Sequence, residues 1–207
     1  MRIRLICAGL ALAGGPALAL EPSFDCTRAE SGAEEAVCAS DALASLDLEL
    51  ARLYELAAGG PHMTAEVLAE LKATQRGWIK GRDDCWKADD GIEACVARDY
   101  ALRIAELRTG HADARAGEGA STGPVAILCE GFEDGISATF VNTAAPMVAL
   151  IWGTDAVAVP QVEAASGAKY AGSGGYLGEV TFWSHGDEAT LSIGGAPEMV
   201  CRQEEIG

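Results

Sequence analysis

Basic side chains are scarce in this sequence. Lysine and arginine number 15 against 31 aspartates and glutamates, which gives a formal net charge of −16 at pH 7. This balance argues against a nucleic-acid partner, because phosphate binding requires a basic surface. It favours a cationic protein partner, since opposite charges accelerate encounter, although solubility alone would also account for an acidic exported protein.

Motifs that would indicate a hydrolase or a metal site are also scarce. The Gly-x-Ser-x-Gly pattern occurs at 119–123, but in a Gly- and Ala-rich stretch rather than at the strand-to-helix turn of a nucleophile elbow. There is no His-Glu-x-x-His pair and no Cys-x-x-Cys pair, and the three histidines are scattered. Ser184, His185 and Asp187 have the residue types of a triad, but the adjacent Ser184 and His185 would point to opposite faces of a strand. No carboxylate pair stands out for glycoside hydrolysis. We therefore expect no enzyme, no metal and no cofactor.

Long apolar runs are lacking except at the N-terminus. Two arginines precede an apolar stretch over 5–12, and the Pro-Ala-Leu-Ala of 16–19 offers an Ala-x-Ala cleavage site. This pattern predicts a secretory signal peptide over 1–19, whose removal leaves a net charge of −18. Neither Cys7 nor Cys26 lies in a sequence typical of lipoprotein cleavage. We expect a soluble periplasmic or secreted protein with no membrane anchor.

Six cysteines remain after the signal peptide. In an oxidising compartment this even number predicts three disulfides. The six are Cys26, Cys38, Cys85, Cys95, Cys129 and Cys201.

The segment 20–108 has helical periodicity. Leucines three and four residues apart predict an amphipathic helix over 34–58, which Gly59-Gly60-Pro61 ends. A second helix is expected after an N-cap at Thr64, and a third from about Ile92. Three helices with short connections predict a small bundle.

The ends of this bundle give a preference for cysteine pairing. An antiparallel hairpin of the first two helices would bring Cys38 to Cys85 and leave Cys26 with Cys95. Four cysteines allow three connectivities, so the sequence does not fix the pairing.

One polar stripe with a large aromatic residue lies on the second predicted helix. It could bind a sugar or a partner surface, but a packed tryptophan beside an ordinary ion pair is the more common arrangement. The stripe comprises Gln75, Arg76, Trp78, Arg82 and Asp83.

Residues 109–123 are rich in Gly, Ala, Ser and Thr, and predict a flexible linker at a domain boundary. Beyond it, over 124–207, short alternating segments separated by turn residues predict an antiparallel sheet closed into a barrel. Cys129 in its first strand and Cys201 in its last would staple it. The predicted strands are Val125–Cys129, Ile136–Val141, Met147–Trp152, Ala156–Val162, Glu179–Trp183, Ala189–Ile193 and Met199–Arg202. The expected fold class is α+β with two domains, a disulfide-linked three-helix bundle followed by a small antiparallel β-barrel.

A candidate loop tip lies within the barrel region. Gly167 permits the positive φ of a tight turn and lets the hydroxyl of Ser166 stand exposed. Lys169 and Tyr170 follow where a strand should resume. Ser-Gly alone is most often an ordinary turn.

The wider pattern is more specific. The Ser-Gly-Ala-Lys-Tyr of 166–170, the Phe-Trp-Ser-His-Gly-Asp-Glu-Ala of 182–189 and the late Cys201 resemble the C-type lysozyme inhibitor family (MliC/PliC) over 124–207. The resemblance implies a small β-barrel whose Ser-Gly-x-x-Tyr loop enters the lysozyme active-site cleft. The lysozyme-binding residues that it implies are Ser166, Gly167, Lys169, Tyr170, His185 and Gly186.

One position departs from that family. Its second motif usually reads Trp-x-Lys-Gly, and this chain has His185 at the lysine position. A histidine supplies a cation only when protonated, and free histidine has a pKa of about 6.5. Inhibition should therefore strengthen as the pH falls toward 6, unless Lys169 provides the charge instead.

The helical half has a family resemblance of its own. Its cysteine framework, with Phe-Asp-Cys at 24–26, Gln-Arg-x-Trp at 75–78 and Arg-Asp-x-Cys at 82–85, resembles the LprI-like (DUF1311) lysozyme inhibitor N-terminal domain. Together the two resemblances imply an exported inhibitor of C-type lysozyme. The alternative is a non-catalytic envelope module that binds a glycan or a protein through its helical domain.

Overall fold

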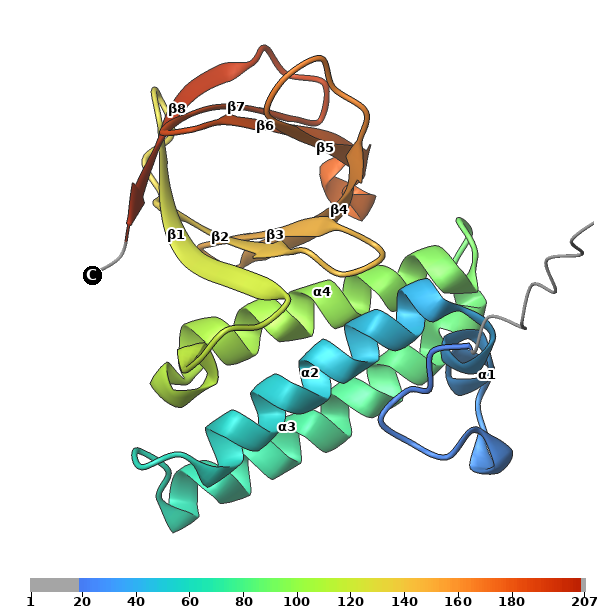
Figure 1. The fold of residues 1–207 in the computed structure, drawn as a ribbon. Coiled ribbons are helices and arrows are strands. Elements are labelled where there is room, and N and C mark those ends of the chain that lie inside the picture. The colour runs from blue at the N-terminus through green and yellow to red at the C-terminus, as the bar shows by residue number, and fades with distance from the viewer. Residues whose placement is uncertain (1–18, 206–207) are drawn as a thin grey trace, which may run out of the picture.

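The computed structural model describes residues 19–205, so the predicted signal peptide lies, but for its last residue, outside the described residues. A helical unit is followed by a closed antiparallel barrel (Figure 1). None of the described helices is long and apolar enough to cross a membrane. The helices are α1 (Gly32–Ala39), α2 (Asp41–Gly59), α3 (Ala65–Asp83) and α4 (Ile92–Gly110), with short 3₁₀ turns η1 (Cys26–Arg28), η2 (Asp84–Lys87), η3 (Ala112–Arg115) and η4 (Gly175–Leu177).

The helix predicted over 34–58 is in fact two helices, so the three-helix bundle is wrong and four α-helices form the unit. The chain leaves the helical conformation at Ser40, which has φ −133°. The Ser40 side chain then accepts a hydrogen bond from the Leu43 backbone N–H (3.4 Å) and caps α2. Val37 before this break and Leu43 after it are both buried, so apolar residues continue on either side and periodicity alone did not show the break.

The other two helices match their predictions. The Thr64 hydroxyl accepts a hydrogen bond from the Val67 backbone N–H (3.3 Å) and caps α3. In α4, which begins at Ile92, the inward stripe of Val96, Tyr100 and Ile104 is fully buried.

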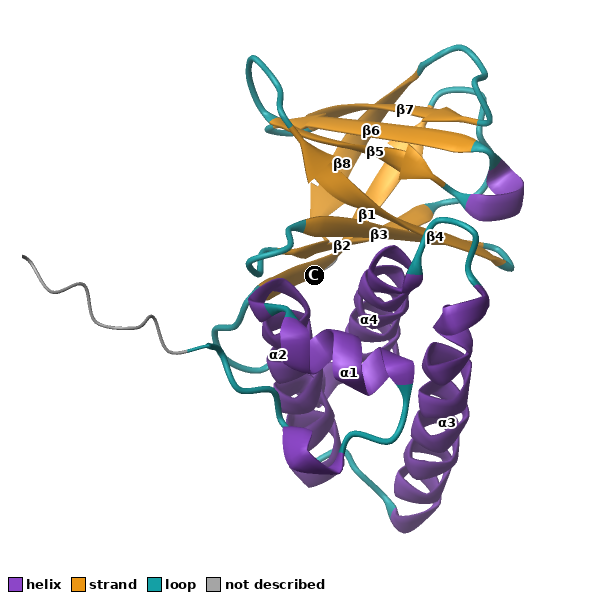
Figure 2. Cartoon of the chain, turned by 90° about the vertical axis from the view of Figure 1, so that its right-hand side faces the viewer, coloured by secondary structure: helices purple, strands orange, loops and turns teal. Residues whose placement is uncertain are grey.

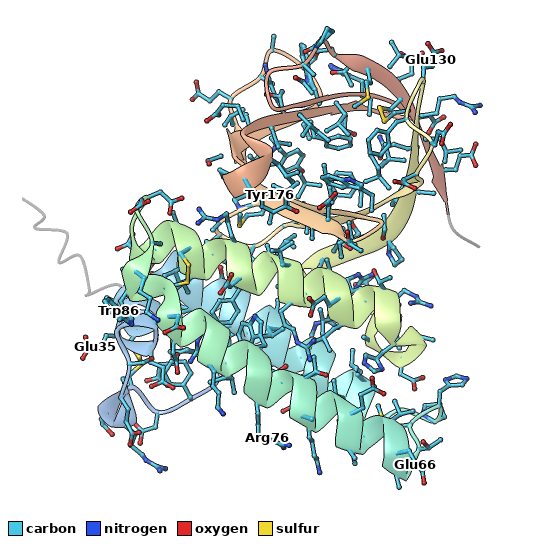
Figure 3. All side chains as sticks on the ribbon, turned by 180° about the vertical axis from the view of Figure 1, so that it is seen from behind. Glu35, Glu66, Arg76, Trp86, Glu130 and Tyr176 are labelled. Carbon is cyan, nitrogen blue, oxygen red and sulfur yellow. A yellow bond between two sulfur atoms is a disulfide. The ribbon has the colours of Figure 1, made fainter. Side chains whose placement is uncertain are left out.

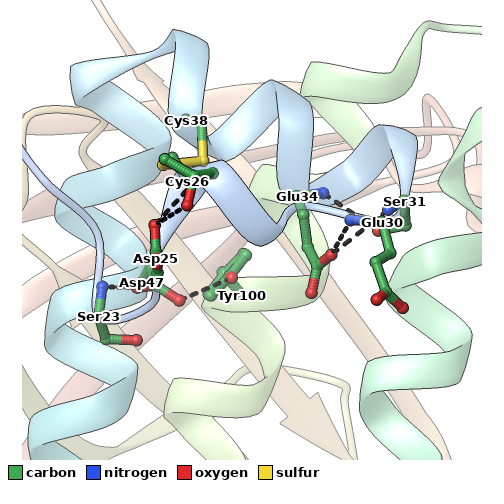
Figure 4. Close-up of a disulfide and its surroundings, with 10 residues drawn as sticks. Ser23, Asp25, Cys26, Glu30, Ser31, Glu34, Cys38, Asp47 and Tyr100 are labelled. Atoms are coloured by element: carbon green, nitrogen blue, oxygen red, sulfur yellow. Dashed lines mark hydrogen bonds between the residues drawn. A yellow bond between two sulfur atoms is a disulfide. The ribbon is translucent and has the colours of Figure 1, made fainter.

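The disulfides of the helical unit join close neighbours in sequence. Cys26 bonds to Cys38 and Cys85 bonds to Cys95, so the preferred pairing of Cys38 with Cys85 and Cys26 with Cys95 is wrong. The cause is local: η1 folds back onto α1, and the turn after η2 brings Cys85 beside the first turn of α4. The Cys26 sulfur, shown in Figure 4, is therefore not free to carry a lipid.

The barrel has eight strands in sequential order, and β8 closes onto β1. The predicted staple between Cys129 and Cys201 is confirmed. One strand, β5, was not among the predicted segments, because its small residues show little alternation. The strands are β1 (Ser121–Cys129), β2 (Ile136–Val141), β3 (Met147–Trp152), β4 (Asp155–Val162), β5 (Ala168–Ser173), β6 (Glu179–His185), β7 (Glu188–Ile193) and β8 (Met199–Glu205).

Helix α4 packs directly against the barrel wall formed by β1 to β4, with α2 and α3 on its far side (Figures 1 and 2). This arrangement explains why β3 is apolar on both faces, since one face lines the barrel interior and the other packs against the helices. Val148 and Leu150 belong to the barrel interior, whereas Met147 and Ala149 belong to the core of the helical unit. The two halves therefore share buried apolar surface.

The segment 109–123, predicted as a flexible linker, has defined contacts. It contains η3, and β1 already begins at Ser121. The buried carboxylate of Glu49 on α2 accepts hydrogen bonds from the Ser121 hydroxyl and from the Ala120 backbone N–H. Arg108 of α4 donates two hydrogen bonds to the Gly123 carbonyl (2.7 and 2.9 Å). Both helices thus hold the start of the barrel.

Candidate functional site

Gly167 ends the connection between β4 and β5 and adopts the predicted positive φ, +66°. A Cβ on this residue would lie 2.2 Å from the Ser184 carbonyl oxygen and 2.8 Å from His185 Nδ1. Glycine is needed here for two reasons, the backbone conformation and the close approach of β6. The residue brings the 163–167 loop against the end of β6.

Ser166 is exposed at this loop. Its backbone carbonyl accepts a hydrogen bond from the indole Nε1 of Trp183 (2.9 Å), which fixes the tip to β6. The side chain is left facing solvent. The Ser166 hydroxyl is therefore exposed to solvent, while β6 holds the backbone of the same residue in place.

A small cluster of side chains lies beside the loop on the outside of the barrel. Lys169 pairs directly with Trp183 across β5 and β6, and its ammonium lies 5.2 Å from the centre of the Trp183 ring. The His185 ring lies 4.5 Å from the same indole. Because Phe182 points into the core, its neighbour Trp183 must point outward, and so must His185. The structure thus brings Lys169, Trp183 and His185 together.

Trp183 was part of the quoted motif, but the sequence reasoning gave it no role. The signal was available: strand alternation over 182–185 puts Trp183 and His185 on one face. The same alternation directs Ser184 inward, where its hydroxyl accepts a hydrogen bond from the Gln203 amide (2.8 Å). Ser184 and His185 therefore do not form a triad with Asp187.

Tyr170 lies inside the barrel, unlike Lys169 and Trp183 on its outer face. Only 3% of its surface is exposed, and its ring lies 6.0 Å from Phe140 and 6.4 Å from Phe182. Burial raises the pKa of its hydroxyl. The residue supports the loop from within, and its ring is not available to a partner.

The turn between β6 and β7 is held by β8. Gly186 has φ +61°, and its carbonyl accepts a hydrogen bond from the Gln203 amide. The Gln203 backbone N–H donates to the Asp187 carbonyl (2.8 Å). Sequence reasoning missed Gln203, since nothing in the strand pattern marks it.

A hollow of about 420 Å³ adjoins His185 on the outer face of the barrel. Val200, which is 57% exposed, contributes to its lining, with Glu188 and Arg202 beside it. The candidate site therefore continues from the loop across β7 and β8.

The polar stripe of the helical unit has the structural role that the sequence favoured. Trp78 donates its indole N–H to the Asp99 carbonyl (3.1 Å) and stacks edge-on against Tyr100. Arg82 is buried and paired with Asp83 (2.9 Å).

Among residues 19–205, the side chains that lie close enough together to hold a metal ion are Cys85, Cys95 and Asp99. Its two sulfurs are bonded to each other, so they are not available to a metal.

The loop-bearing barrel and the disulfide-bonded helices correspond to two models of protein families. Residues 128–199 match the family described as membrane-bound lysozyme-inhibitor of c-type lysozyme, and residues 26–111 match the family described as lysozyme inhibitor LprI. Both family descriptions name lysozyme inhibitors, a non-catalytic class of protein.

Known relatives extend the match over most of the chain. Lipoprotein LprI of Mycobacterium tuberculosis and that of Mycobacterium bovis are each 31% identical to it over 182 residues, covering 87% of this chain and 83% of the relative. The chain belongs to the LprI family of lysozyme inhibitors. No solved structure matches it.

Proposed function

We propose that this protein inhibits C-type lysozyme outside the cytoplasm by inserting the 163–167 loop into the active-site cleft of the enzyme. The observation that carries the proposal is the exposed Ser166 on a turn that Gly167 and Trp183 hold in one conformation. Preorganisation of this kind lowers the entropy lost on binding. The three disulfides are consistent with an oxidising compartment.

The chemistry of the target suits a hydroxyl. C-type lysozyme uses a protonated glutamic acid and an ionised aspartate on either side of the scissile bond. The Ser166 hydroxyl donates to the ionised carboxylate and accepts from the protonated one, in the place of a substrate oxygen. It offers no glycosidic bond to cleave, so the complex is a dead end.

Charge supports both encounter and docking. The net charge, −18 once the predicted signal peptide is removed, attracts a cationic enzyme over long range. Beside the loop Lys169 supplies a cation, because its ammonium lies over the Trp183 ring. A cation at this position faces the acidic groups of the cleft, in the role that the second-loop lysine has in the resembling family.

The test is inhibition of lysozyme-driven cell-wall lysis by the mature protein and by Ser166→Ala. Loss of hydrogen bonds to charged groups, worth roughly 1.5–3 kcal/mol, should weaken inhibition about ten- to a hundredfold. Ser173→Ala, an exposed serine at the far end of β5, serves as the matched control and should inhibit as the wild type does. Equal inhibition by Ser166→Ala and the control would refute insertion of this loop.

A further inference from the structure

The helical unit contains a cavity of about 440 Å³ that the loop mechanism does not use. It lies between the segment before α1 and the helices α1, α2 and α3. Three aromatic side chains, Phe24, Tyr54 and Trp78, contribute to its walls. Ligand sites typically combine such apolar walls with a few fixed polar groups.

One wall of the cavity is held in place by covalent and hydrogen bonds. The Cys26–Cys38 disulfide ties the segment before α1 to that helix, and the Ser23 backbone N–H donates to Asp47 Oδ2 (2.5 Å), as Figure 4 shows. Ser23 and Phe24, which line the cavity, are thereby fixed above α2. The cavity is preformed rather than a gap between mobile segments.

The lining has an excess of negative charge. Glu34, Asp47 and Glu55 oppose a single cation, Arg82. The Arg82 guanidinium already donates hydrogen bonds to Asp83 and to the Tyr100 hydroxyl (3.0 Å). It also lies 3.5 Å from Glu34, so this one cation is shared among several partners and, within residues 19–205, leaves Asp47 and Glu55 without an ion pair.

Asp47 is a buried carboxylate in this lining. It is 6% exposed, and its hydrogen bonds come from two neutral donors, the Tyr100 hydroxyl (2.9 Å) and the Ser23 backbone N–H. Within the described part of the chain, no lysine or arginine nitrogen lies within ion-pair distance of it. Arg82 reaches Asp47 only through the shared Tyr100 hydroxyl, and a buried carboxylate with no cation in direct contact keeps a negative potential in the cavity beside it.

We infer that this cavity receives a basic side chain of lysozyme, so that the helical unit supplies a second contact with the enzyme. The inference rests on the proposed function for the identity of the partner. A lysine or arginine side chain brings an apolar stem for the aromatic walls and a charged end for the carboxylates. An acidic exported protein with a cationic partner thereby uses two separate surfaces, the loop of the barrel and the cavity of the helices.

The experiment is calorimetric binding of a C-type lysozyme to the full mature protein and to two cavity variants. Glu55→Arg reverses the charge at an exposed position of the lining and should weaken binding tenfold or more. Glu35→Arg makes the same change in net charge on the exposed side of α1, labelled in Figure 3, outside the cavity. It should weaken binding no more than about threefold, through reduced electrostatic steering. Equal effects of Glu55→Arg and Glu35→Arg would overturn the inference.

Ala51→Leu tests the same cavity without changing its charge. Ala51 lines the cavity, and a larger side chain there should fill it and weaken lysozyme binding to a similar extent. Circular dichroism checks that Ala51→Leu folds. If Ala51→Leu does not fold, the comparison of Glu55→Arg with Glu35→Arg still tests the inference. If Ala51→Leu instead leaves lysozyme binding intact and abolishes binding of tri-N-acetylchitotriose, the cavity binds glycan and the inference is wrong.

The two proposals fail separately. Full inhibition by Ser166→Ala would remove the loop mechanism and leave the cavity measurements standing. If both cavity variants bind lysozyme as the wild type does while Ser166→Ala inhibits less, the cavity contact is refuted and the loop contact is supported. If both contacts act, combining Ser166→Ala with Glu55→Arg should multiply their separate effects, because the sites share no residue.

Discussion

At the scale of single residues, substitutions at two glycines would have different costs. One would strain the backbone alone, and the other would also cause a steric clash. Gly167 and Gly186 have similar positive φ values, +66° and +61°. A Cβ at Gly167 would meet the Ser184 carbonyl at 2.2 Å, whereas a Cβ at Gly186 would meet nothing within 4 Å. Gly186→Ala should therefore destabilise the barrel by about 1 kcal/mol through strain alone. Gly167→Ala should cost more and also weaken inhibition, because the loop must move. Thermal unfolding and lysis assays on both variants test this, and indistinguishable results would contradict it.

His185 gives a prediction about pH. Its ring stacks on Trp183 beside the loop, so a proton on it adds positive charge at the proposed contact. Histidines generally take up that proton near pH 6 to 7. Inhibition by the wild type should strengthen between pH 7.5 and pH 6, and His185→Ala should lose that dependence. A flat profile in the wild type would assign the cationic role to Lys169 alone, which lies over the same indole.

Part of the site could be read from the sequence at this scale. The positive φ of Gly167 follows from its place in a Ser-Gly turn, since other residues avoid that conformation. The interior position of Tyr170 was not predicted, because the weak alternation of β5 does not show which of its residues face inward. The anchoring by Gln203 was not predicted either, because it depends on where β8 lies beside the turn between β6 and β7.

At the scale of elements, the disulfides differ in the length of chain that they close. Cys129–Cys201 spans 72 residues, whereas Cys85–Cys95 spans 10. In the chain-entropy model these loops correspond to about 4 and about 3 kcal/mol. Replacing both cysteines of the barrel pair by alanine should therefore lower the free energy of unfolding more than the same change at Cys85 and Cys95. Urea denaturation compares the two, and the reverse order would show that local strain outweighs loop entropy.

The elements that the sequence predicted correctly are those with a strong local pattern. Thr64 caps α3 and Ile92 begins α4 as expected, because capping and periodicity act within one or two turns. The break at Ser40 and the two short disulfides were not predicted. At Ser40 the buried residues continue on both sides of the break, and the two disulfides depend on turns whose geometry the sequence pattern does not show.

At the scale of the whole molecule, the two halves are joined by buried polar contacts as well as by α4. Glu49 on α2 is paired with Arg52 (2.7 Å) and accepts hydrogen bonds from Ser121 and Ala120 at the start of β1. Composition alone predicted a flexible segment there, since Gly and Ala give no sign of a partner. The partners are charged residues on helices far back in the sequence, and only the assembled fold shows them.

This junction should respond to acid. Burial alone would raise the pKa of Glu49, but hydrogen bonds from Arg52 and Ser121 outweigh it and hold the pKa below its ordinary value. A carboxyl group with a lowered folded-state pKa stabilises the fold fully above the unfolded value, and that contribution is lost as the pH falls through the folded value. Glu49→Gln removes the charge and keeps an acceptor for Ser121. The wild type should therefore be more stable than Glu49→Gln at pH 7, and the difference should shrink as the pH falls below the range where glutamates normally ionise. Urea denaturation of both proteins across that range measures it, with Glu70→Gln on exposed α3 surface as the control. A difference that grows on acidification would mean that the Glu49 carboxylate does not stabilise the junction between the helices and the barrel.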